Sequence, residues 1–283
     1  MARPGSRLLH RMVWLRLSLL LSAPLAWMLL VYVVALAALL ITSLWSVDSL
    51  TSEIDRTWTF DNFRTLLDNE VYRTVTLRTL GVAVAVTVID VAIALPIAFY
   101  MAKVASPRVR RMLVVAVLTP LWASYLVKVF SWRVVLSEGG LADWTGLGSP
   151  GYGLTAVIIT QAYIWLPYVI LPIFASLERV PDSLLEAAGD LGAPSGLVLR
   201  SIVFPLLVPG IVAGAIFSFS LTMGDYITVN IVGGANQMLG NLVYINAGAA
   251  NNLPLAAAIA MIPIVVMLVL LTAIRRTGAL DNL

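Results

Sequence analysis

The side chains that usually carry covalent, redox or metal chemistry are scarce in this chain. It has no Cys, and its single His, His10, lies among Arg residues near the N-terminus. These absences exclude a disulfide framework, thiolate or imidazole metal clusters and catalytic triads with a His base. We therefore expect no cofactor, and an enzyme is disfavoured because no cluster of nucleophile, base or metal ligands is visible.

A phosphate-binding P-loop is also missing. A P-loop places a Lys directly after a Gly, so that its charge reaches phosphates held by backbone amides. The chain has two Lys, and Lys103 follows Ala102 whereas Lys128 follows Val127. Any step that consumes ATP must therefore take place on a separate protein.

The most informative spacing lies in residues 178–214, which read ERVPDSLLEAAGDLGAPSGLVLRSIVFPLLVPGIVAG. Ser183 and Glu186 have the three-residue spacing of a capping box, which predicts a short helix from Ser183 to about Leu191. Four apolar residues at helical spacing give this helix one apolar face. They are Leu184, Leu185, Ala188 and Leu191.

A sharp turn should follow this short helix. Gly192 suits the left-handed position after a helix C-terminus, and Pro194 prevents the helix from continuing. Ser195 can cap a second short helix, and Pro205 marks a bend into the next apolar segment. Two short helices with an exposed apolar face would fit a groove on another protein.

Two acidic residues lie in or beside apolar segments. Asp90 falls near the middle of one, where a charge in a bilayer costs about 2.5–3.5 kcal/mol, so it should face the protein interior. It either lines a solute pathway, where it could pair with a cationic substrate, or bonds to a neighbouring helix. Asp225 and Tyr226 follow Gly224 at the end of another apolar segment. Asp225 either meets a cationic solute there or is a solvated helix-end residue.

Three aromatic residues, Trp122, Tyr125 and Trp132, lie in or beside one apolar segment. Their rings could stack on an aliphatic cation, which makes them candidate pathway residues. The alternative is that they anchor the segment at the membrane interface, which is the commoner use of such residues. Gln161 is a further polar residue in an apolar segment, and its sequence context assigns it no role.

Membrane-spanning helices must position these residues. Of the 283 residues, 60% are hydrophobic and 12% are charged, with a mean hydropathy of +0.94, which exceeds what one soluble core can bury. We predict an all-α membrane protein with six spans, over about 24–46, 79–102, 112–131, 154–177, 206–223 and 253–274. The chain then divides into a basic cytoplasmic tail over 1–23, a membrane domain over 24–274 and a cytoplasmic tail over 275–283. The membrane domain contains the six spans and a polar loop over 178–205.

The Lys and Arg residues predict the orientation. Four precede the first span, four follow the second, two follow the fourth and two follow the sixth, which places twelve of the eighteen on one side. That side is cytoplasmic by the positive-inside rule, so both termini and the loop 178–205 lie inside. The isoelectric point near 9.3 therefore reflects membrane topology, and nucleic acid is not an expected partner.

The segment 178–205 resembles the EAA motif of binding-protein-dependent ABC importer permeases. The matching residues are Glu186, Ala187, Ala188, Gly192, Ile202, Phe204 and Pro205, with Phe204 where Leu is usual. The resemblance implies a type I ABC importer permease fold in a bacterial inner membrane. It also implies that this loop is a coupling helix that docks into an ATPase subunit. The coupling residues would be Leu184, Glu186, Ala187, Ala188, Leu191 and Gly192.

The whole chain also resembles permeases of spermidine/putrescine importers. The similar stretches are WTFDNF from Trp58, LPIAFYMAK from Leu95, DLGAP from Asp190, FPLLVPGIVAG from Phe204 and GDYITVNIVGG from Gly224. Importers for iron, aminoethylphosphonate, thiamine and opines share much of this pattern and remain alternatives. An alternative of another class is a proton-coupled secondary transporter with Asp90 as relay.

The resemblance implies three protein partners besides the lipid bilayer. They are an ATP-binding subunit dimer, a second permease subunit that is usually a different chain, and an extracytoplasmic solute-binding protein. Transport would then proceed by alternating access, with the loop 178–205 moving as a rigid body when ATP closes the ATPase dimer.

Overall fold

A computed structural model describes residues 5–48, 51, 53–144 and 148–276, which are mostly helical. The helices are α1 (Gly5–Ser43), α2 (Asp61–Asp68), α3 (Glu70–Phe99), α4 (Pro107–Trp122), α5 (Tyr125–Val135), α6 (Leu141–Trp144), α7 (Leu154–Glu178), α8 (Asp182–Asp190), α9 (Ser195–Val198), α10 (Phe204–Gly224), α11 (Ile227–Val232), α12 (Leu239–Ala247) and α13 (Leu253–Arg276). Two π-helical turns, η1 (Tyr100–Val104) and η2 (Leu199–Val203), extend α3 and precede α10. The strands β1 (Ser46–Val47) and β2 (Ile54–Asp55) form a short antiparallel pair. Both predicted tails, 1–23 and 275–283, lie partly outside the described residues.

Within the described residues, five helical stretches are long and apolar enough to cross a membrane, and the bent pair α4 and α5 can form a sixth. The five are Leu20–Ser43, Glu70–Val104, Leu154–Glu178, Gly196–Gly224 and Leu253–Arg276. The predicted class, an all-α membrane protein with six spans, is thereby confirmed. The second span is longer than the predicted 79–102, because α3 begins at Glu70, directly after a cap in which Asn69 Oδ1 accepts from the Val71 amide.

The third span differs from the continuous helix predicted over 112–131. The chain leaves helical geometry at Ala123 and Ser124, and α4 and α5 meet at 95°. Hydropathy measures apolar content and carries no information on such a break. Tertiary contacts hold α5 in its new direction, because the Tyr125 hydroxyl lies 2.7 Å from Thr228 Oγ1 on α11.

Three helices, α3, α7 and α10, pack against one another along the centre of the bundle. Two buried glycines let α10 approach α7 closely. A Cβ on Gly210 would lie 2.7 Å from the Pro172 carbonyl oxygen, and one on Gly214 would lie 3.0 Å from the Val169 Cα. Small residues at such crossings allow the backbone contact on which helix association in membranes depends.

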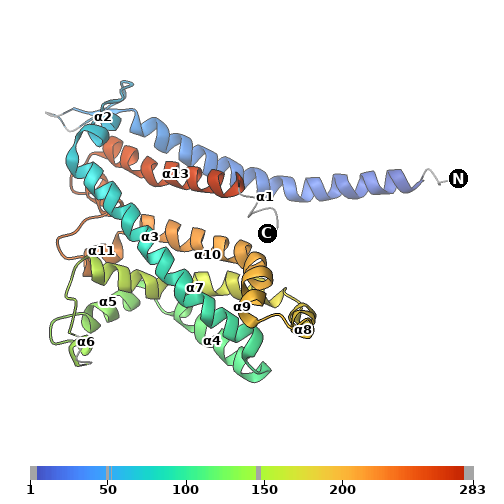
Figure 1. The fold of residues 1–283 in the computed structure, drawn as a ribbon. Coiled ribbons are helices and arrows are strands. Elements are labelled where there is room, and N and C mark those ends of the chain that lie inside the picture. The colour runs from blue at the N-terminus through green and yellow to red at the C-terminus, as the bar shows by residue number, and fades with distance from the viewer. Residues whose placement is uncertain (1–4, 49–50, 52, 145–147, 277–283) are drawn as a thin grey trace.

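The first helix has a different environment from the rest. Figure 1 shows the C-terminal half of α1 lying beside α13, whereas the N-terminal half of α1 projects beyond the bundle. None of the most apolar 18 residues within Leu20–Ser43 is buried by the chain itself. In a bilayer this surface can face lipid or another protein, because both are apolar.

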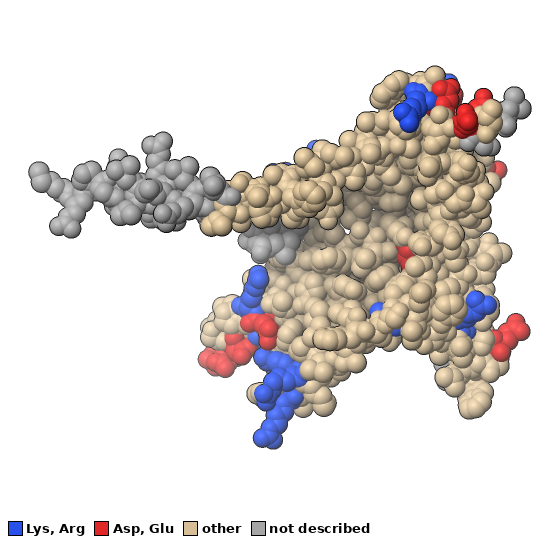
Figure 2. Space-filling view, turned by 180° about the vertical axis from the view of Figure 1, so that it is seen from behind, with Lys and Arg blue, Asp and Glu red and all other residues tan. Residues whose placement is uncertain are grey.

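The two ends of the bundle carry most of its charge. Figure 1 places α8 and α9 at one end and α2, α6 and α11 at the other, and Figure 2 shows charged side chains gathered at these ends around a largely uncharged surface. Lys103, Arg108, Arg110 and Arg111 lie at the end that carries α8, which is called the basic end below. The positive-inside rule predicts that the basic end is cytoplasmic.

The close crossing of α7 and α10 leads to a stability prediction. Gly210→Ala should lower the free energy of unfolding by about 1–3 kcal/mol, because the new methyl group is forced against the Pro172 carbonyl. The matched control is Gly81→Ala on α3, where an added Cβ meets no heavy atom within 4 Å. Thermal unfolding of both variants in detergent tests this, and equal midpoints for the two would contradict it.

Candidate functional site

The first candidate site is the hairpin formed by α8 and α9 at the basic end. Its predicted capping box is wrong, because α8 begins at Asp182, after Pro181, and its N-terminus has no side-chain cap. Ser183 is therefore already inside the helix and cannot act as its N-cap. Asp182 instead places a negative charge in the first turn, where the helix dipole favours it.

The predicted left-handed turn after α8 is confirmed. Gly192 has φ +71°, and its amide donates to the Gly189 carbonyl at 2.8 Å. The Ala193 amide donates to the Ala188 carbonyl at 3.0 Å, which completes a Schellman motif. An added Cβ at Gly192 meets nothing within 4 Å, so the backbone angle and not the available space demands glycine here.

The predicted single apolar face of the hairpin is wrong, because its four residues divide between two directions. Leu185 and Ala188 face the protein, where Leu185 packs against a core cluster and Ala188 is buried. Leu184 and Leu191 are exposed, Leu191 to 87%, and Glu186 and Ala187 are exposed beside them. The residues available to a partner are therefore these last four, and Ala188 holds the hairpin to its own chain.

The second candidate site is a cavity of about 320 Å³ where α10 ends. Its lining includes three predicted pathway residues, Tyr125, Asp225 and Tyr226. The other lining residues are Trp165, Ser220, Leu221, Gly224 and Ile227. α10 begins beside the hairpin, so the cavity lies toward the opposite end of the bundle.

The Asp225 carboxylate is fixed from two sides. Gln161 Nε2 on α7 donates to Asp225 Oδ2 at 3.0 Å, and the Thr228 amide donates to Asp225 Oδ1 at 3.0 Å. Asp225 is 8% exposed and therefore differs from the solvated helix-end residue that was one sequence interpretation. These bonds orient a negative group at the edge of an aromatic cavity.

Aromatic rings form the walls of this cavity. Tyr125 stacks on Trp165 with ring centroids 5.9 Å apart, and Tyr226 stacks on Tyr244 at 4.8 Å. Sequence analysis missed Trp165 and gave Gln161 no role. The available signal was their spacing of four residues on one helix, which places both on the same face.

The other three predicted pathway residues lie elsewhere. Asp90 is fully buried, and Ser218 Oγ on α10 donates to its Oδ2 at 2.6 Å, which is the bond to a neighbouring helix that one interpretation expected. Trp122 is 90% exposed at the end of α4, and Trp132 packs on Tyr163 with centroids 5.4 Å apart. None of these three lines the Asp225 cavity.

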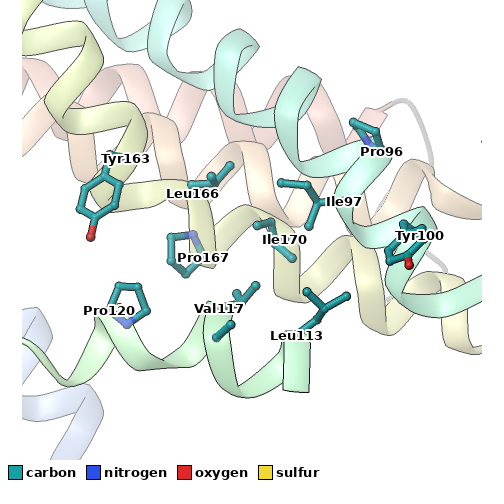
Figure 3. A pocket seen from close by; sticks show the side chains of 11 residues that line it. Pro96, Ile97, Tyr100, Leu113, Val117, Pro120, Tyr163, Leu166, Pro167 and Ile170 are labelled. Carbon is teal, nitrogen blue, oxygen red and sulfur yellow. The ribbon is translucent and has the colours of Figure 1, made fainter. Parts of the chain in front are cut away.

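A larger crevice of about 560 Å³ lies between α4 and the pair α3 and α7. Figure 3 shows it lined by apolar side chains and prolines, with Tyr163 and Tyr100 toward opposite ends. This lining suits an apolar occupant, because it offers a charged solute no opposite charge. The crevice is therefore not the candidate solute site.

Spanning helices, a hairpin exposed at the basic end and an acidic aromatic cavity toward the other end define the class of a membrane transport subunit. Residues 71–277 match the model of the family described as binding-protein-dependent transport system inner membrane component, and the chain belongs to this family. It is therefore a multi-pass inner-membrane permease subunit of an ABC importer and not an enzyme.

Similar proteins support this placement. The inner membrane ABC transporter permease protein YdcU of Escherichia coli is 38% identical, with 100% of this chain and 97% of that protein covered. The spermidine/putrescine transport system permease protein PotB of Escherichia coli is 30% identical over 82% of this chain and 86% of that protein.

Solved structures establish the fold. A chain of a bacterial alginate ABC transporter in complex with a pentasaccharide-bound periplasmic protein superposes with a TM-score of 0.70 at 16% identity, covering 96% of both chains. A chain of the MetNI methionine ABC transporter in an inward-facing conformation gives 0.60 at 17% identity, covering 74% of this chain and 97% of that one. The predicted type I ABC importer permease fold is thereby confirmed.

The turn at Gly192 generates a prediction for the assembled importer. Gly192→Val should reduce ATP-driven uptake about fivefold or more, because left-handed geometry costs a β-branched residue at least about 1–2 kcal/mol and the hairpin loses its shape. Gly192→Asn is the matched control, because Asn tolerates this backbone region. Uptake and membrane content are measured for both, and unchanged uptake in the Val variant would contradict the prediction.

Proposed function

We propose that this permease subunit moves a small organic cation of the polyamine class across the membrane, and that the α8–α9 hairpin docks into an ATPase subunit. The single observation that carries the substrate class is the Asp225 cavity. It combines a fixed carboxylate with the rings of Tyr125, Trp165 and Tyr226. An aliphatic ammonium ion pairs with the carboxylate and is attracted to the faces of the aromatic rings.

The relatives support this substrate class to different degrees. PotB is named for spermidine and putrescine transport and is 30% identical, whereas the name of YdcU states no substrate. A carboxylate held in this position attracts a cationic solute and repels an anionic one. The cavity chemistry therefore favours a cation over the alternative aminoethylphosphonate or opine substrates, which carry acidic groups.

Docking of an ATPase is supported by the exposed part of the hairpin. Leu184 and Leu191 project from a short helix at the basic end, beside the exposed Glu186 and Ala187. A rigid helix with protruding leucines suits a groove on a second protein. α8 also follows shortly after α7 and is joined to α10 through α9 and η2. A movement of α8 would therefore be transmitted along the chain to both α7 and α10.

The remaining expected partners are a second permease and a solute-binding protein. In Haemophilus influenzae, PotB and PotC are both named as permease proteins of a spermidine/putrescine transport system, and both are similar to this chain. PotC is 32% identical over 42% of this chain. We propose a heteromeric pair of permeases, which receives its solute from an extracytoplasmic binding protein.

Reconstituted transport tests the proposed function. The complete importer in proteoliposomes should take up labelled putrescine or spermidine only when ATP is present on the ATPase side. A secondary transporter would instead show uptake that follows a proton gradient without ATP. Uptake of aminoethylphosphonate or thiamine in preference to polyamines would overturn the substrate class while leaving the ATP dependence intact.

Asp225 gives a second, site-specific prediction. Asp225→Asn should lower cation uptake about tenfold or more, because a bond to a charged group contributes about 1.5–3 kcal/mol while the side-chain shape is kept. The matched control is Asp68→Asn, which removes an exposed acid at the end of α2, beside the start of α3. Uptake rates at equal membrane content are compared, and equal rates for both variants would exclude Asp225 from the pathway.

A further inference from the structure

The structure fastens the hairpin to a helix that is not adjacent to it in sequence. The span formed by α3 and η1 ends at Val104, next to the start of α8. η1 is a π-helical turn, closed by the Ala105 amide donating to the Tyr100 carbonyl at 2.8 Å. π-Helical turns are rare in proteins, and those that occur are often found at functional sites. The extra residue in the turn rotates the side chains that follow it relative to a regular α-helix. This turn carries Lys103.

Lys103 reaches across to the start of the hairpin. Its Nζ donates to the Val180 carbonyl at 2.6 Å and to Asp182 Oδ1 at 2.7 Å. The Lys103 side chain is only 9% exposed, so its ammonium depends on these two acceptors for compensation of lost hydration. The hydrogen bond and positive charge of Lys103 lower the pKa of Asp182.

Arg110, in the first turns of α4, reinforces the same junction. Its guanidinium donates to the Met101 and Ala102 carbonyls at 3.0 and 2.6 Å and to Glu178 Oε1 at 3.4 Å. It therefore joins α4, η1 and the end of α7. The four segments α4, η1, α7 and α8 meet at this point. Lys103 and Arg110 are the two charged residues that join them by donating to backbone carbonyls.

The hairpin also packs against a hydrophobic cluster beside these polar bonds. Leu185 of α8 and Val198 of α9 pack against a buried cluster that contains Met101 and Ala102 of η1 and Leu177 of α7. The hairpin thus packs against a cluster to which η1 also contributes, and Lys103 adds a direct polar bond between η1 and the start of the hairpin.

We propose that Lys103 is a positioning residue for energy coupling, which transmits movement of the hairpin directly to α3 in addition to α7 and α10. The inference rests on the proposed docking of an ATPase at the hairpin. Lys103 touches neither solute nor nucleotide in this scheme. Its role is to make α3 move with the hairpin, so that the three packed central helices respond together.

The test is the coupling ratio, defined as solute taken up per ATP hydrolysed, in the complete reconstituted importer. Lys103→Met keeps the apolar stem and removes the donors. We expect the ATPase to co-purify with this variant in the usual ratio while the coupling ratio falls about fivefold or more, within the usual range for coupled sites. Lys103→Arg should retain most of the ratio, because it keeps the charge and several donors.

The matched control is Arg108→Met, which removes an exposed basic residue at the same end. It should leave the coupling ratio unchanged. If Lys103→Met does not accumulate in the membrane, Asp182→Asn provides the second variant, because it weakens the charged half of the contact at an exposed residue. It should lower the coupling ratio by a smaller factor.

The outcomes separate this inference from the proposed function. ATP-independent uptake by the unmodified importer would overturn the proposed function itself. Normal coupling in Lys103→Met and Asp182→Asn, with ATP-driven uptake by the unmodified importer, would overturn only the role of Lys103. Loss of ATPase co-purification in Lys103→Met would show that the lysine supports docking, and would also overturn the transmission role.

Discussion

The absence of hydrogen-bonding solvent in the bilayer core is the constraint on which the rest of this structure depends. Backbone amides must be satisfied within each segment, so the spans are helical. Side chains with charge must either move to the ends or pair inside the protein. The chain does both, because its Lys and Arg gather mainly near the ends whereas Asp90 is buried against Ser218. Function is then confined to the ends and to the few places where buried polar groups meet.

The two candidate sites are connected by the same pair of helices. α7 carries Gln161 and Trp165 at the cavity and ends at the hairpin, while α10 begins after the hairpin and ends beside Asp225. Gly210 and Gly214 hold these two helices in backbone contact between the sites. These two helices therefore form a direct structural connection between the hairpin and the cavity.

Sequence reasoning succeeded where one residue or one composition decides the outcome. Apolar content and length predicted the class of an all-α membrane protein, and Gly192 followed by Pro194 predicted the left-handed turn. It failed where tertiary contacts decide. Apolar content does not show the break after Trp122, which contacts between α5 and α11 maintain. The pairing of Gln161 with Asp225 joins residues 64 positions apart. The capping box failed because the N-cap is Pro181 and not Ser183, a difference of two residues that is a usual uncertainty at helix ends.

The Asp90–Ser218 bond acquires a role once the hairpin junction is considered. α3 is joined to α10 near mid-span by this bond and to the hairpin at its basic end by Lys103. These two bonds add to the extensive packing of α3 against α7 and α10. Removing either Asp90 or Ser218 alone would leave a buried polar group without its partner, which costs more than the bond itself contributes. The pair is therefore a structural link between α3 and α10, and neither residue lines the cavity that contains Asp225.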